Sequence, residues 1–143
     1  MITAYLDSSV IVRVVLSETA ALEEWNTLEA GVSSVLARAE CHRSLERRWR
    51  NRELTDEQFE SKRAALNATL GQLDLRPVDS EILGLASNPF PTWVATLDAI
   101  HLATALAYRR AQQDDGPILF ATHDRQLAKA ATALHFDVIG LAA

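Results

Sequence analysis

The stretch Ile118-Leu119-Phe120-Ala121-Thr122-His123-Asp124 decides the fold of this chain. Its four apolar residues come in an unbroken run, which is typical of a strand buried on both faces of a parallel sheet. Gly116-Pro117 marks a turn just before the run, and Asp124 opens a segment that predicts a helix to about Leu134. A strand that leads directly into a helix is the repeating unit of a parallel α/β sheet.

The same order of strand and helix recurs along the chain. Residues 2–6 predict a strand, and an apolar helix follows it through Val15. Further strands are expected at 31–35, 75–78 and 136–141, and further helices at 18–28, 36–51, 55–73, 79–86 and 96–111. Thr55, with Gln58 three residues on, predicts a capping box, and Thr96 is expected to cap the helix at 96–111. Since crossovers between parallel strands are right-handed, we predict a three-layer α/β/α sandwich around a parallel sheet of about five strands.

Length and composition predict one globular domain over residues 1–143, with two charged helices at about 36–73 forming an arm. Apolar residues make up 48% and charged residues 23%, an ordinary balance for such a domain. Cys41 is the one cysteine, so an internal disulfide is impossible and a reducing cytoplasm is favoured. No stretch approaches the ~20 apolar residues of a membrane helix, and no signal segment is recognisable at the start. We expect a cytoplasmic protein.

The charge is unevenly distributed. A net charge of −5 argues against a general nucleic-acid coat protein. Arginines nevertheless gather in and just beyond the helix expected at 36–51; they are Arg38, Arg43, Arg47, Arg48, Arg50 and Arg52. This cluster could bind a nucleic-acid backbone or an acidic partner. It could equally be a solvated face with internal ion pairs such as that of Glu46 with Arg50.

Acids stand at equivalent places in the predicted fold, namely at strand ends or near helix starts; they are Asp7, Glu40, Asp98 and Asp124. In a parallel sheet all such places lie along one edge, so these side chains could share one crevice. Carboxylates brought together repel one another unless a hard cation neutralises them. The arrangement predicts a hydrolase that depends on Mg²⁺ or Mn²⁺.

Each acid also has a simpler structural role. Asp7, Asp98 and Asp124 could cap helices or complement a helix dipole, and Glu40 could pair with Arg43 on the surface. Thr122 could orient a carboxylate or merely cap a helix. What favours a functional site is the joint placement of all these residues at one edge.

The histidines and tryptophans indicate less about function than the acids do. The histidines lack the spacing of a zinc helix. His101 could contact Asp98, one turn before it, although a packed or half-exposed histidine is the simpler expectation. Trp25, Trp49 and Trp93 are expected to be packing residues rather than platforms on which bases stack.

Short motifs in a fixed order resemble those of a PIN domain and, more narrowly, of the VapC toxins of prokaryotic toxin–antitoxin pairs. The motifs are Tyr5-Leu6-Asp7-Ser8-Ser9-Val10, Arg38-Ala39-Glu40 with Arg43, Leu97-Asp98-Ala99-Ile100-His101-Leu102-Ala103-Thr104-Ala105, and Thr122-His123-Asp124-Arg125-Gln126-Leu127. The resemblance covers nearly the whole chain. It implies an endoribonuclease that needs Mg²⁺ or Mn²⁺, is often a homodimer, and is silenced by a VapB-like antitoxin.

The resemblance also implies roles for the site residues. Asp7 and Asp98 would be the principal metal ligands, Glu40 a ligand or an orienter of the attacking water, and Asp124 a second-site or water-mediated ligand. Thr122 would supply the hydroxyl beside the last acid. The side chains expected to contact RNA phosphates are Arg43 and Arg47, about one and two turns beyond Glu40.

Other functions fit the residues less well. A receiver-like signalling domain also binds Mg²⁺ at a sheet edge, but it wants a second acid beside Asp7, where Ser8 stands, and a late lysine outside a helix, unlike Lys129. A phosphatase with an aspartyl nucleophile needs an acid where Ser9 stands. A non-catalytic module that binds partners through its arginine-rich helix remains an alternative.

Overall fold

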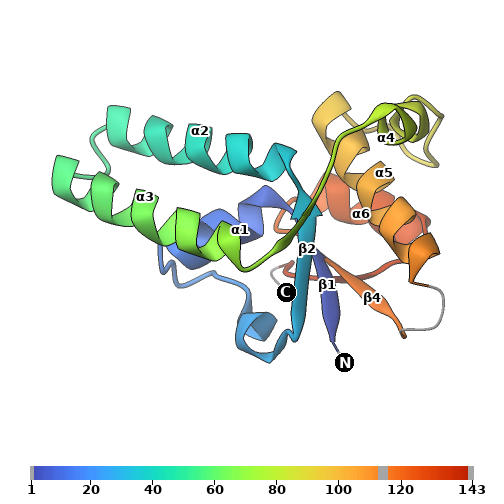
Figure 1. Cartoon of the computed structure of the whole chain (residues 1–143), viewed down its shortest axis with the longest axis horizontal. Coiled ribbons are helices and arrows are strands. Elements are labelled where there is room, and N and C mark those ends of the chain that lie inside the picture. Colours follow the sequence, from blue (N-terminus) through green and yellow to red (C-terminus); the bar gives the residue numbers. More distant parts are fainter. Residues whose placement is uncertain (1, 113–115, 142–143) are drawn as a thin grey trace.

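The computed structural model describes residues 2–112 and 116–141, and it shows a parallel sheet with helices on both faces (Figure 1). The strands are β1 (Thr3–Leu6), β2 (Ala30–Ser34), β3 (Asp74–Arg76), β4 (Ile118–Ala121) and β5 (Asp137–Ile139). They lie in the order β3-β2-β1-β4-β5, and every neighbouring pair is parallel. The predicted α/β fold with about five parallel strands is therefore confirmed.

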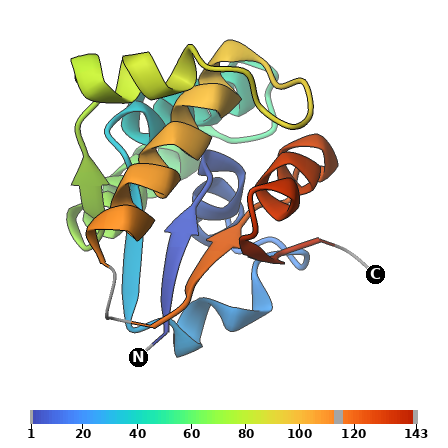
Figure 2. The same ribbon diagram turned by 90° about the vertical axis from the view of Figure 1, so that its right-hand side faces the viewer.

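Helices follow the strands and form the two outer layers. They are α1 (Ser8–Val15), α2 (Leu36–Arg50), α3 (Asp56–Gly71), α4 (Ser80–Ala86), α5 (Thr96–Ala111) and α6 (Arg125–Ala133). Figure 1 shows α1, α2 and α3 on one side of the sheet and α4, α5 and α6 on the other. Seen from the second side, α5 crosses in front of the strands, with α4 packed against it (Figure 2).

Alternation along β1 divides the core between the two faces of the sheet. Ala4 and Leu6 are fully buried in the cluster formed with α1, α2 and α3. Tyr5 points to the opposite face, where its ring stacks on Phe120 with the centroids 5.3 Å apart. Both faces of the central strands are therefore buried from solvent, as their unbroken apolar runs predict.

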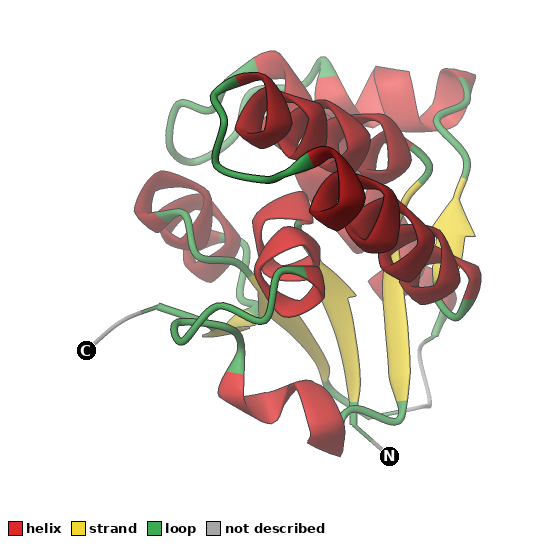
Figure 3. Cartoon of the chain, turned by 90° about the vertical axis from the view of Figure 1, so that its left-hand side faces the viewer, coloured by secondary structure: helices red, strands yellow, loops and turns green. Residues whose placement is uncertain are grey.

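Helices α2 and α3 form a hairpin that extends beyond the sheet (Figures 1 and 3). Thr55 accepts from the backbone N–H of Gln58 at 3.1 Å, and the Gln58 side chain accepts from the Thr55 N–H at 2.9 Å, which confirms the capping box. The Trp49 ring stacks on Phe59 with the centroids 4.4 Å apart, and its Nε1 donates to Asp56 at 2.9 Å. The tip of the hairpin is thus fixed by packing and by hydrogen bonds.

Two local predictions are wrong. The helix expected at 18–28 is only a 3₁₀ helix, η1 (Glu23–Thr27), and the backbone turns before it at Ser17, with φ of 55°. Thr96 is the first residue inside α5, and the N-cap position belongs to Ala95. Among the helices that the structure describes, none combines the length and apolar character that crossing a bilayer requires.

Candidate active site

The parallel register brings the residues after β1 and β4 to the same level of the sheet. Leu6 pairs with Ala121, so Asp7 and Thr122 follow side by side. The buried Thr122 hydroxyl donates to Oδ2 of Asp7 at 3.0 Å, across 115 positions of sequence. Two residues singled out by the sequence are therefore in direct contact.

The Asp7 carboxylate is held by a chain of hydrogen bonds and is only 6% exposed. Ser9 Oγ donates to Oδ2 at 2.7 Å, beside the bond from Thr122. These two hydroxyls in turn accept backbone N–H groups, Ser9 from His123 at 3.2 Å and Thr122 from Asp124 at 3.0 Å. The backbone just after β4 therefore fixes the two hydroxyls, and these hydroxyls fix the carboxylate.

Asp124 occupies the N-cap of α6. Its Oδ1 accepts from the backbone N–H groups of Gln126 at 2.8 Å and Leu127 at 3.1 Å, so the capping role is confirmed. The other oxygen, Oδ2, takes no part in the cap. The side chain is exposed at the same edge as Asp7.

Glu40, on the first turns of α2, is connected through a histidine to the core. His101 Nε2 lies 2.5 Å from Oε1 of Glu40, and His101 Nδ1 lies 2.7 Å from the Tyr5 hydroxyl. With a neutral ring, Nε2–H donates to Glu40 and the Tyr5 O–H donates to Nδ1. The packed His101 is confirmed, since it is fully buried, but its carboxylate partner is Glu40 rather than Asp98.

The protonation of His101 is set by opposing effects. Burial lowers the pKa of this imidazole, because a charged ring is poorly solvated there. The hydrogen bond and negative charge of Glu40 raise it, with help from Asp7 and Asp98, so that the pKa ends above its ordinary value. The pKa of His101 is therefore raised by several carboxylates at the edge together and not by Glu40 alone.

Asp98, in the first turn of α5, shows most directly that the acids interact. Burial raises its pKa, and the negative charges of Asp7, Asp124 and Glu40 raise it further, while His101 opposes them; the pKa is about 6. Burial alone raises the pKa of a carboxyl group, but the added effects of Asp7, Asp124 and Glu40 require that their carboxylates lie near enough to repel the charged form of Asp98. The four predicted acids therefore share one electrostatic neighbourhood.

The donor chemistry of this edge fits a hard divalent cation. All four acids offer carboxylate oxygens, and repulsion among them is relieved by positive charge. Within residues 2–112 and 116–141, however, no three His, Cys, Asp or Glu side chains are arranged so that they could together hold a metal ion. The edge thus has the type of ligand and the negative charge that suit a metal ion, but among the described residues its carboxylates do not form a preorganised metal site.

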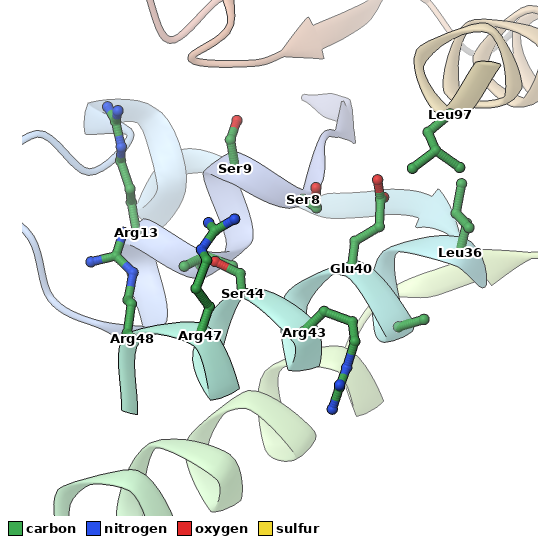
Figure 4. Close-up of a pocket in the computed structure, with 12 residues that line it drawn as sticks. Ser8, Ser9, Arg13, Leu36, Glu40, Arg43, Ser44, Arg47, Arg48 and Leu97 are labelled. Carbon is green, nitrogen blue, oxygen red and sulfur yellow. The ribbon is translucent and has the colours of Figure 1, made fainter. Parts of the chain in front are cut away.

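A pocket of about 620 Å³ opens between α1 and α2 beside this edge (Figure 4). Its walls include Ser8, Ser9, Arg13, Glu40, Ser44, Arg47, Arg48 and Leu97. The pocket therefore runs from the acidic edge to a group of guanidinium groups.

The arginines of the pocket differ in how they are held. Glu18 binds Arg48 at 2.8 Å and Arg13 at 3.7 Å. Figure 4 shows Arg43 directed away from Glu40 toward α3, and both of its terminal nitrogens lie 3.0 Å from Glu46. The alternatives that paired Glu40 with Arg43 and Glu46 with Arg50 are therefore wrong.

The raised pKa of Asp98 predicts that the metal-free protein loses stability as pH rises from about 4 to about 6. In this interval the folded protein keeps a proton that the unfolded chain has released, so rising pH favours unfolding. Asp98→Asn removes the effect and should raise the free energy of unfolding at pH 7 by about 1 kcal/mol, a small value because the group is partly exposed. Urea unfolding in EDTA at pH 4 and at pH 7 measures this, and an equal gain at both pH values would contradict it.

Fold and site together are those of a recognised family. The family model of the PIN domain matches residues 4–133. The chain therefore belongs to the PIN domain family.

Relatives define the subgroup more closely. The chain is 39% identical over 142 residues to a protein named Ribonuclease VapC46 of Mycobacterium tuberculosis (strain ATCC 25618 / H37Rv), covering 97% of this chain and 98% of that one. It is 30% identical over 139 residues to Ribonuclease VapC47 of Mycobacterium tuberculosis (strain CDC 1551 / Oshkosh), covering 92% of each. The predicted resemblance to VapC proteins is confirmed.

Proposed function

We propose that this protein is an endoribonuclease that hydrolyses RNA phosphodiester bonds, depends on Mg²⁺ or Mn²⁺, and is neutralised by a VapB-like antitoxin. The observation that carries the proposal is the gathering of four carboxylates at one edge of the sheet: burial raises the pKa of Asp98, and the negative charges of Asp7, Asp124 and Glu40 raise it further. Such mutual repulsion is the electrostatic environment that a divalent cation relieves. The full-length similarity to two proteins named as ribonucleases supports the same activity.

The metal would be held by Asp7 and Asp98, with Glu40 and Asp124 as further or water-mediated ligands. When bound, it would lower the pKa of a water molecule and offset the charge that develops on the phosphodiester. The chain's own contribution is orientation: Ser9 and Thr122 fix the Asp7 carboxylate by hydrogen bonds of 2.7 Å and 3.0 Å. A fixed carboxylate reduces the rearrangement needed during reaction.

Glu40 is suited to accept a proton from the attacking water. Its Oε1 is bonded to Nε2 of His101, and that ring is itself held by the Tyr5 hydroxyl. The hydrogen bond from His101 fixes the orientation of this carboxylate, and a base must be positioned within reach of the proton that it accepts. The other oxygen of Glu40, Oε2, is then the one that faces substrate.

Arg47 is the better placed of the two predicted RNA contacts. Its side chain is exposed and lines the pocket that begins at Glu40. A guanidinium group there can bind an RNA phosphate with two parallel hydrogen bonds. Arg43 remains a proposed contact as well, because its surface pair with Glu46 is of the kind that contributes at most about 1 kcal/mol and yields to a phosphate.

The partners follow from the same charges. A basic antitoxin side chain would enter the acidic edge, or antitoxin carboxylates would pair with the arginines beside it. A homodimer is proposed from the family resemblance. Cys41 is free and buried, which suits a protein that works in the reducing cytoplasm.

The test is RNA cleavage by the purified, antitoxin-free protein with Mg²⁺, with Mn²⁺ or with EDTA, for the wild type and for Asp98→Ala. Cleavage is expected with either metal and should be lost with EDTA or with the substitution. EDTA-treated protein should regain activity when metal is restored, which excludes irreversible damage. Cleavage that persists in EDTA, or in Asp98→Ala, contradicts the proposed mechanism.

A further inference from the structure

Trp93 is the most exposed large hydrophobic side chain among the described residues, with 74% of its surface accessible. It lies in the loop between α4 and α5, shown in yellow at the top of Figure 2. The expectation that this tryptophan packs in the core is therefore wrong. Leaving an indole in water is unfavourable, which suggests a ligand or partner that covers it.

The loop is tied to the segments that carry two of the acids. Trp93 lies three residues before α5, whose first turn contains Asp98. Its backbone carbonyl accepts from Nε2 of Gln126 at 3.3 Å, and Gln126 follows Asp124 by two positions. Fully extended, the chain from Trp93 to Asp98 could span no more than about 18 Å. The backbone of the loop at Trp93 is therefore bonded to α6 and lies within about 18 Å of Asp98.

The loop also forms a pocket with polar groups in its wall. This pocket, of about 570 Å³, is lined by Trp93 together with Phe90, Thr92, Asn88 and Ser87. Within the described part of the chain, the buried Oγ1 of Thr92 has no hydrogen-bond partner. An aromatic wall beside an amide and an unsatisfied hydroxyl suits a flat ligand with polar edges.

We propose that Trp93 is a stacking platform for an unpaired base of the RNA, near the phosphodiester that is cut. This inference rests on the proposed ribonuclease function. Proteins that bind single-stranded RNA commonly stack its bases on exposed aromatic rings, while arginines contact the phosphates. Trp93 is then a positioning residue: it holds a base of the strand while Arg47, in the pocket that also contains Glu40, holds a phosphate.

The proposal is tested by binding of a short, dye-labelled single-stranded RNA of mixed sequence to the full chain in the inactive Asp98→Asn background. Trp93→Ala should weaken binding about tenfold, and Trp93→Phe should restore most of the loss, because a second aromatic ring can stack on the base. Leu83→Ala is the matched control, since Leu83 is an exposed hydrophobic residue on α4, and it should bind like the parent.

The salt dependence of RNA binding distinguishes a stacking contact from a contact with a phosphate. Trp93→Ala should leave the slope of log K against log salt unchanged, while Arg47→Ala should reduce it by about 0.7, the value for one phosphate contact on a single strand. Tryptophan fluorescence should also be quenched when RNA binds, and Trp93→Phe should remove that quenching while RNA still binds. A merely structural role for Trp93 would produce none of these differences.

Each failure has its own meaning. If the parent binds RNA and Trp93→Ala binds it equally well, the stacking role is overturned while the ribonuclease proposal stands. If Trp93→Ala changes only the mass of the protein in sedimentation, Trp93 contacts a second copy of the chain and the stacking role is again overturned. If the Asp98→Asn parent does not bind RNA and the wild-type protein does not cleave it, both proposals fall.

Discussion

Asp7→Asn is expected to reduce RNA cleavage by about 100-fold or more, as removal of one preorganised electrostatic group does in other enzymes. Asparagine keeps the shape of the side chain, and its carbonyl oxygen can still accept from Ser9 and Thr122. What it removes is one negative charge at the edge where metal is expected to bind. Initial rates with saturating Mg²⁺ measure the loss.

The same substitution should abolish the growth arrest that the wild-type protein is expected to cause when expressed in a bacterium. It should also lower the pKa of Asp98, because the charge of Asp7 is one of the causes that raise it. Unchanged thermal unfolding is the control that separates lost chemistry from lost structure. Arrest that persists in a folded Asp7→Asn protein would point to another activity.

Gly140→Ala is expected to destabilise the protein by about 2–4 kcal/mol, because it combines a steric clash with a strained backbone. The backbone of Gly140 has φ of 104°, a conformation that residues with a Cβ rarely adopt. A Cβ added there would lie 2.6 Å from the carbonyl oxygen of Thr122. Urea unfolding measures the loss of stability.

This substitution should also disturb the site, because the Gly140 segment holds the end of β4. His123 Nδ1 lies 2.6 Å from the Gly140 carbonyl oxygen, and the Thr122 N–H donates to Ile139 at 3.1 Å. The matched control is Gly84→Ala in α4, where an added Cβ meets nothing within 4 Å and should stabilise the helix by about 0.5–1 kcal/mol. Equal effects of the two substitutions would refute this account.

Much of the site could be predicted because strand ends in a parallel sheet must meet at one edge. Asp7, Asp98, Thr122 and Asp124 lie directly at strand ends or helix starts, and each is recognisable from local sequence. The charges of Asp7 and Asp124 both raise the pKa of Asp98, as expected for side chains that meet at one edge of a sheet.

The contact between Glu40 and His101 could not be predicted in the same way. It joins residues 61 positions apart on two helices, and it depends on where α2 and α5 lie relative to each other. One indication was present: His101 and Tyr5 are polar residues within otherwise apolar runs, and buried polar groups nearly always have partners. The sequence thus indicates that partners exist but does not identify them.

Predictions from local sequence were wrong where tertiary packing or an alternative ion pair determined the structure. In the segment expected to be helical at 18–28, Leu22 is buried and Trp25 and Leu28 pack against the core, yet only η1 forms. These apolar residues do face the core, but an irregular segment with one 3₁₀ helix places them there instead of an α-helix. Arg43 was one of the expected partners of Glu40, and instead it pairs with Glu46, three positions later on α2.

The bond between Thr122 and Asp7 has a consequence for synthesis on the ribosome. Because 115 positions separate its two ends, a growing chain that stops before β4 has the first carboxylate but neither the hydroxyl that orients it nor Asp124. Partial translation products therefore lack an assembled catalytic edge. Under the proposed ribonuclease function, a nascent chain is therefore expected not to cleave RNA until translation is nearly complete.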